Sequence, residues 1–111
     1  MKRKTSRLPA ALRGLSLAHR VKFRTMARAY GISDPGGIEV LVSGLVSLDE
    51  AVRCEAQIEA DGRLQTDRFG QLKAHPLLPV ARDARAAWQS ALRGLTLDIG
   101  TPPKVGRPGG S

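Results

Sequence analysis

One stretch decides the fold of this chain: residues 34–60, which read DPGGIEVLVSGLVSLDEAVRCEAQIEA. Asp34 can accept hydrogen bonds from free backbone N–H groups as an N-cap, and Pro35 suits the first helical position. Gly62 follows Asp61 and can end the helix as a left-handed cap does. The stretch therefore predicts one long helix.

The predicted helix is apolar on two sides. Large side chains recur at spacings of 3 and 4 on one face, the large row: Ile38, Leu41, Leu45, Leu48 and Val52. Mostly small side chains form a second row, the small row: Val40, Gly44, Ser47, Ala51, Cys54 and Ile58. Because a helix with two apolar sides needs two neighbours, and a chain this short can hardly supply both, we expect the small row to be an interface between copies.

The composition indicates one small domain with tails. The chain has 111 residues and few aromatic side chains, so its core is small and partners are expected. A single cysteine, Cys54, excludes an internal disulfide and fits a reducing compartment. No apolar run approaches the roughly 18–20 residues of a membrane span, and Arg13 interrupts the one that would mimic a signal peptide. We expect a cytoplasmic protein with no membrane partner.

The net charge of +8 is distributed unevenly. Residues 1–33 hold nine Lys or Arg and no acidic residue, whereas residues 34–62 hold seven acidic residues and one Arg. A basic arm beside an acidic helix indicates contact with a polyanion at one end only, with nucleic acid as the first candidate. The alternative is a solvated arm that keeps the protein soluble.

The N-terminal third divides into residues 1–14, expected to be a disordered basic arm, and residues 15–33, expected to be a basic helix capped by Ser16. Arg20, Arg24 and Arg28 recur every fourth residue and can follow phosphates along a nucleic-acid backbone. An ordinary solvated helix face remains the alternative. The expected DNA-binding residues are Lys2, Arg3, Lys4, Arg7, Arg20, Lys22, Arg24, Arg28, Lys104 and Arg107.

The segment around Gly31 also has features of a helix-turn-helix bend, in which glycine permits the tight turn. A recognition helix should carry polar, base-reading side chains in its first turns. Residues 35–38, Pro-Gly-Gly-Ile, offer none. The sequence therefore argues against this motif without excluding it.

The C-terminal half predicts a second helix that starts near Pro79 and has Trp88 as its core anchor. Residues 63–76 are expected to be a loop with a short extended piece at residues 64–66, under which Phe69 and Leu72 could pack. Residues 34–98 thus form a helical-hairpin oligomerisation core, and residues 99–111 a disordered Pro/Gly tail. The predicted fold class is all-α, with a long and a shorter helix as an antiparallel hairpin.

No group of residues predicts catalysis. Asp67 and His75 lack an accompanying nucleophile or third ligand, so we interpret His75 as structural or solvent-facing. Cys54 reads as a packing residue. We expect no enzyme activity, no cofactor and no metal site.

Residues 61–98 resemble the small terminase subunits of tailed bacteriophages, in the cohesive-end branch and its prophage relatives. The likeness lies in Gly62, Thr66-Asp67-Arg68-Phe69-Gly70, His75-Pro76, the Arg82–Arg85 segment and the Leu92–Asp98 run LRGLTLD. With the preceding helix it covers about 65 residues. Thr96 stands where relatives often have Gly.

The resemblance implies a helical hairpin that assembles into a ring, binds double-stranded DNA at the packaging start, and regulates a large subunit. That large terminase subunit would hold the ATPase and the nuclease, so this chain would be non-catalytic. Two other interpretations stay open: a small basic helical adaptor that binds nucleic acid non-specifically, and a protein scaffold whose arm serves only solubility.

Overall fold

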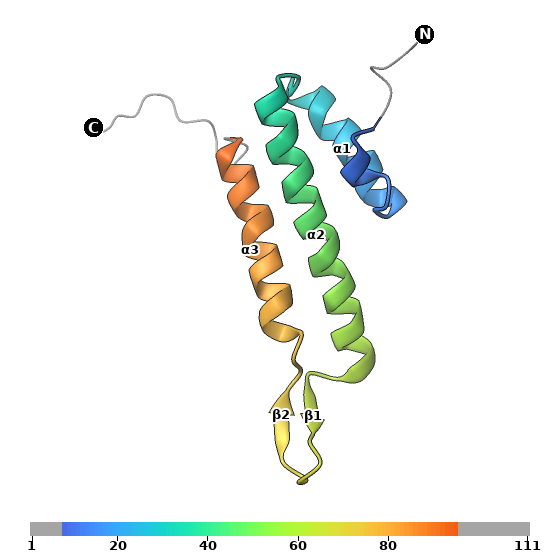
Figure 1. Cartoon of the computed structure of the whole chain (residues 1–111), viewed down its shortest axis with the longest axis vertical. Helices are drawn as coiled ribbons and strands as arrows, with labels where there is room; N and C mark the ends of the chain where they lie inside the picture. The colour runs from blue at the N-terminus through green and yellow to red at the C-terminus, as the bar shows by residue number, and fades with distance from the viewer. Residues whose placement is uncertain (1–7, 96–111) are drawn as a thin grey trace, which may run out of the picture.

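The computed structural model describes residues 8–95 as three helices and a small β-hairpin (Figure 1). The elements are a 3₁₀ turn η2 (Ala10–Leu12), helices α1 (Leu17–Ala29), α2 (Pro35–Asp61) and α3 (Leu78–Gly94), and strands β1 (Leu64–Thr66) and β2 (Leu72–Ala74). The predicted hairpin of a long and a shorter helix is confirmed as α2 and α3, which lie side by side (Figure 1).

The long helix α2 begins and ends at the residues that the sequence predicts. The Asp34 carboxylate accepts a hydrogen bond from the Gly37 N–H at 2.9 Å, and Pro35 is the first helical residue. Gly62 ends the helix with φ 92° and ψ 145°. This positive φ favours glycine, but the ψ value places Gly62 outside the left-handed helical region that the sequence analysis expected.

The small row of α2 packs against α3 of the same chain. Gly44, Ala51, Cys54 and Ile58 are buried, and Val40 and Ser47 are half-buried. At Gly44 the two helices come so close that an added Cβ would lie 2.6 Å from the Ala91 Cβ. The surface assigned above to a second copy is therefore already covered by α3.

The large row of α2 packs against α1 and η2. Leu41, Leu45 and Leu48 form one buried cluster with Leu12, Phe23, Met26 and Trp88. A fully buried Leu contributes roughly 1.5–3 kcal/mol of transfer free energy, so this cluster anchors η2 and α1 to α2. The expectation that the chain can hardly supply two neighbours for α2 is wrong, because α3 covers one side of the helix and α1 covers the other (Figure 1).

The boundary of the N-terminal arm also differs from the prediction. Residues 8–14, assigned to a disordered arm, include η2, and Leu12 within it is fully buried. Leu8 and Leu15 lie at spacings of 4 and 3 from Leu12 and pack against the same cluster, but Pro9 and Gly14 interrupt the segment and hide this short pattern in the sequence. Residues 1–7 and the predicted tail, residues 99–111, lie outside the described residues.

The segment predicted as a loop contains an antiparallel β-hairpin. β1 and β2 pair in the register Leu64 with Ala74 and Thr66 with Leu72, and the hairpin projects beyond the ends of α2 and α3 (Figure 1). Phe69 and Leu72, expected to pack under this segment, are exposed. Among residues 8–95, no helix is long and apolar enough to cross a membrane.

Candidate nucleic-acid interface

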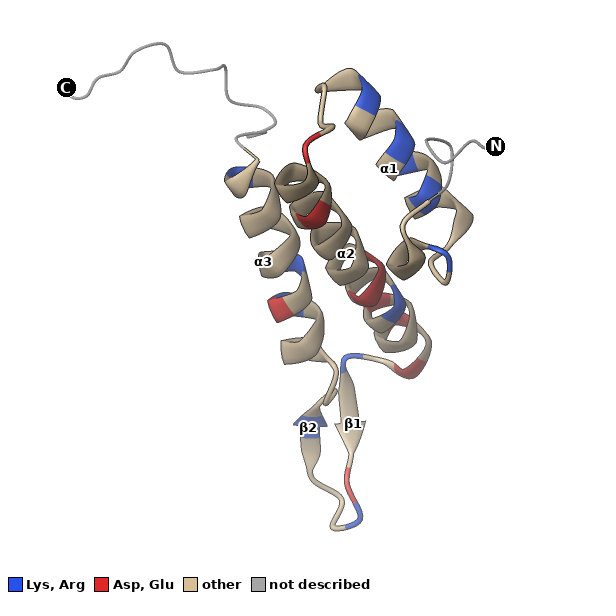
Figure 2. Ribbon diagram, turned by 45° about the horizontal axis from the view of Figure 1, so that its top comes forward, with Lys and Arg blue, Asp and Glu red and all other residues tan. Residues whose placement is uncertain are grey.

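Helix α1 separates its side chains into a buried and a basic side. His19, Phe23 and Met26 are buried toward α2, because their spacings of 4 and 3 place them on one face. Arg24 and Arg28 lie one turn apart on the opposite face and are exposed. Figure 2 shows that basic positions recur along the length of α1.

The predicted row of three arginines is not uniform. Arg20 is half-buried, and its Nε is a buried atom without a hydrogen-bond partner among the described residues. Lys22, by contrast, is exposed. The solvent-accessible basic set on α1 is therefore Lys22, Arg24 and Arg28, with Arg20 at its edge.

The positive charge of α1 is not neutralised within the described chain. Residues 8–33 contain no Asp or Glu, and the ion pairs found in residues 8–95 include none with Lys22, Arg24 or Arg28. Most acidic residues lie on α2 (Figure 2), and the one in contact with α1, Asp49, pairs with His19 and Arg53 and not with Lys22, Arg24 or Arg28. Exposed, unpaired cations on one helix make an anion-attracting surface.

A polar cluster that the sequence analysis missed fixes the start of α1 on the middle of α2. His19 Nδ1 donates to Asp49 Oδ1 at 2.8 Å, and Arg53 Nε lies 2.7 Å from Asp49 Oδ2. Arg53 also reaches the Gly14 carbonyl at 3.4 Å, and the Ser16 side chain caps α1 by accepting from the His19 N–H. We call His19, Asp49 and Arg53 the tether.

The tether holds a buried carboxylate in its charged form. Burial raises the pKa of Asp49, but the hydrogen bonds from His19 and from the Ser16 backbone, with the charge of Arg53, outweigh it, so the net pKa lies below its ordinary value. The only sign of this site in the sequence is Asp49, which directly follows Leu48 of the large row. That signal is visible only once the register of α1 on α2 is known.

His75, the second histidine, is buried and links two helices through hydrogen bonds. His75 is buried, its Nδ1 accepts from the Leu77 N–H at 3.0 Å, and its Nε2 lies 2.9 Å from Asp61 Oδ2. Since Nδ1 accepts, the ring proton is on Nε2 and is donated to Asp61. His75 thus joins the end of α2 to the start of α3, and Asp67 lies in the hairpin turn instead.

The remaining expected site residues fall into two groups. Lys2, Arg3, Lys4, Arg7, Lys104 and Arg107 lie outside the described residues, so the structure does not place them. Cys54 is buried between α2 and α3, consistent with a packing residue. In the part of the chain that the structure describes, no three His, Cys, Asp or Glu side chains are grouped so that they could hold a metal ion.

Comparisons with known proteins return no match: no family model, no curated protein and no solved structure is similar to this chain at a significant level.

Proposed function

We propose that this protein binds double-stranded DNA through α1 and acts as the non-catalytic small subunit of a phage packaging terminase. The observation that carries the DNA-binding part is the set of exposed, unpaired cations on α1: Arg24 and Arg28 on one face, and Lys22 on another side of the same helix. The buried side of α1 is anchored by Phe23 and Met26, so these cations are presented on a rigid support.

The spacing of the cations suits a nucleic-acid backbone. Arg24 and Arg28 are four residues apart on one face, which corresponds to about 6 Å along the helix axis. Phosphate contacts of this kind set affinity and register but carry no sequence information. The basic residues outside residues 8–95 would add contacts of the same type.

The terminase part rests on the resemblance of residues 61–98 together with the preceding long helix. In this proposal the α2–α3 hairpin is the assembly unit of a homo-oligomer, and the partner is a large terminase subunit that holds the ATPase and the nuclease. The protein would act in the cytoplasm of an infected or lysogenic bacterium.

The second candidate is a small basic adaptor that binds nucleic acid without sequence preference. It is favoured by the first turn of α2, where Pro35, Gly36 and Gly37 present no side chain that can read a base edge. The two candidates differ in sequence preference, so competition between a packaging-start fragment and random DNA of equal length separates them.

The test of DNA binding is a salt titration of affinity. We expect the triple variant Lys22→Ala/Arg24→Ala/Arg28→Ala to bind a DNA duplex more weakly than the unaltered protein at low salt. Its slope of log K against log salt should be smaller by up to about 0.9 for each phosphate that the variant no longer neutralises. Fluorescence anisotropy with a labelled duplex measures both quantities.

A matched triple variant controls for total charge. Arg63, Arg82 and Arg93 are exposed and lie on or beside α3, away from α1. Replacing these three by Ala removes the same charge and should leave most of the salt slope intact. Equal decreases in affinity in the two variants would show that net charge, and not the face of α1, governs binding.

A further inference from the structure

The β-hairpin exposes one apolar face. Since residues directly opposite in an antiparallel pair lie on the same side of the sheet, Leu64, Thr66, Leu72 and Ala74 share a face. Leu64 and Leu72 are 62% and 67% exposed, and no helix of the described chain covers them. Two strands alone are marginally stable in water, so this face is expected to be covered by something else.

The turn of the hairpin presents an aromatic side chain in a fixed position. The Asp67 carboxylate Oδ1 accepts from the N–H groups of Phe69 at 2.8 Å and Gln71 at 3.0 Å, and Gly70 closes the turn at φ 81°. Phe69 is nevertheless 77% exposed, with the Arg68 guanidinium 5.4 Å from its ring centre. Aromatic and Arg side chains in this arrangement are typical anchors of protein interfaces.

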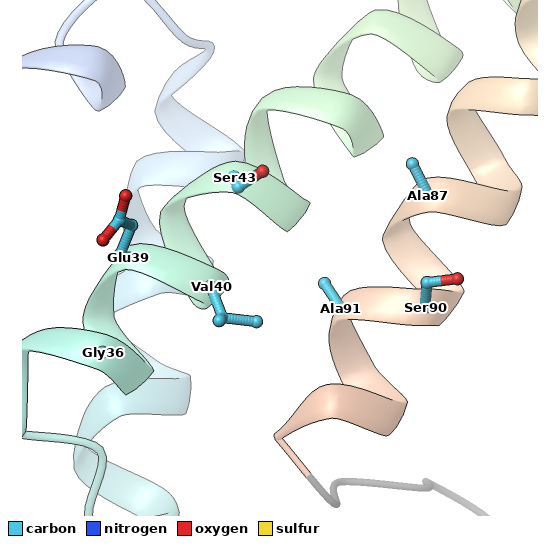
Figure 3. A pocket seen from close by; sticks show the side chains of 7 residues that line it. All are labelled: Gly36, Glu39, Val40, Ser43, Ala87, Ser90 and Ala91. Atoms are coloured by element: carbon cyan, nitrogen blue, oxygen red, sulfur yellow. The ribbon is translucent and has the colours of Figure 1, made fainter.

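A groove suited to these two side chains lies at the other end of the helical hairpin. Figure 3 shows it between the start of α2 and the end of α3, with Val40 and Ala91 facing each other across it and Glu39 at its outer edge, on the side of α2 turned away from α3. Its volume is about 450 Å³, whereas a cavity of about 150 Å³ already holds benzene. Small side chains, among them Ser43 and Ala87, leave room for an aromatic ring.

Charge favours this groove over a second groove, which lies beside Ile58. Glu39 is the one charged residue in its lining, and it forms no ion pair within residues 8–95. The second groove has Arg63 and Arg82 in its lining but also Glu55 and Glu59, and Glu55 is paired with Arg85 at 2.8 Å. An incoming Arg68 therefore meets an uncompensated negative charge at the first groove, whereas the charges that line the second groove balance.

We infer that the β-hairpin of one copy docks on a second copy of this chain, with Phe69 in the groove between α2 and α3 and Arg68 beside Glu39. The hairpin and the groove lie at opposite ends of the molecule (Figure 1). Two copies arranged antiparallel would therefore make the contact twice, and copies arranged head to tail would make it once per neighbour. The inference deepens the proposed function, since it names the surface through which copies would assemble.

The first experiment measures self-association of the full chain by sedimentation equilibrium. We expect the unaltered protein to associate in the micromolar range, and Phe69→Ser to weaken the association roughly tenfold or more. Because Phe69 is exposed in the single chain, circular dichroism should show an unchanged fold. Val21→Ser, which removes an exposed apolar side chain from α1, is the matched control and should associate normally.

The second experiment is a charge exchange. Arg68→Glu and Glu39→Arg should each weaken association, and the double variant should restore it. A monomeric unaltered protein, or Phe69→Ser that associates normally, overturns the inference. Weaker association of Phe69→Ser without rescue in the double variant overturns the choice of groove. DNA binding by the Phe69→Ser variant is measured separately, so failure of this interface and failure of the basic α1 face are told apart.

Discussion

At the scale of single residues, the contact between α2 and α3 depends on Gly44. An added Cβ would lie 2.6 Å from the Ala91 Cβ and 3.0 Å from the Trp88 ring, and the Ala91 Cβ moves only with the backbone of α3. We predict that Gly44→Ala lowers the free energy of unfolding by about 1–3 kcal/mol, because the helices must separate. Denaturant unfolding measures the change.

Gly94 provides the control for this substitution. It is also helical, but the nearest atom to its added Cβ is the Val40 Cγ1 at 3.9 Å. Gly94→Ala should therefore be neutral or stabilising, by up to about 1 kcal/mol, because alanine is the better helix former. If both variants were destabilised equally, the close approach at Gly44 would not be the cause.

Sequence reasoning at this scale identified the caps and the anchor but not the tertiary polar contacts. Asp34, Pro35 and Trp88 act through local patterns, and all three have the predicted positions. His19 and Asp49 are 30 residues apart, and no local pattern joins them. Such a pair becomes visible only when the relative register of two helices is fixed by their packing.

At the scale of elements, α1 is held on α2 by one apolar face and by the tether. We predict that Asp49→Ala selectively speeds amide hydrogen exchange in α1, because it leaves the buried His19 Nδ1 with only the Ser16 Oγ, at 3.0 Å, and releases Arg53 from Asp49. The expected cost in stability is about 1–3 kcal/mol. Hydrogen exchange followed by mass spectrometry resolves α1 from the α2–α3 hairpin.

Glu50→Ala is the control for the tether, since Glu50 is the exposed neighbour of Asp49. It should leave exchange in α1 unchanged. A uniform increase over all three helices in Asp49→Ala would instead mean that the molecule opens as one unit.

The elements also show where periodicity succeeds and where it fails as a predictor. It located α2 and α3, because both repeat apolar residues at helical spacing, whereas α1 was expected from its Ser16 cap. It could not decide which side of α2 faces α3, because both of its rows are apolar. The two three-residue strands of the hairpin are too short to show alternation, and only Leu64–Thr66 was expected to be extended.

At the scale of the whole molecule, stability should depend on acid pH. Hydrogen bonds from Arg85 lower the pKa of Glu55, and those from Gln57 and His75 lower the pKa of Asp61, while the pKa of Asp49 is lowered by the tether despite its burial. A carboxyl whose pKa is lower in the folded than in the unfolded state stabilises the fold above its unfolded value, near pH 4. That contribution disappears as the pH falls through the folded value.

We therefore predict that the melting temperature falls as the pH is lowered from about 5 to 2, with protonation of these three carboxylates contributing. Thermal unfolding followed by circular dichroism measures this dependence. The variant Asp49→Asn should show a shallower decrease than the unaltered protein. An identical slope would mean that Asp49 does not contribute to the dependence.

The position of α1 along α2 determines how far the basic residues of α1 lie from the β-hairpin. The tether fixes α1 against the first half of α2, and the β-hairpin begins beyond its last turn. The 27 residues of α2, at a rise of about 1.5 Å each, make a helix about 40 Å long. Helix α1 lies along one half of it, and the β-hairpin projects from its far end. Because β2 leads into α3, and His75 joins the start of α3 to Asp61 of α2, both helices must lengthen together to move the hairpin outward, by about 1.5 Å for each residue added to each helix. The length of the α2–α3 pair thus sets the distance between the two surfaces.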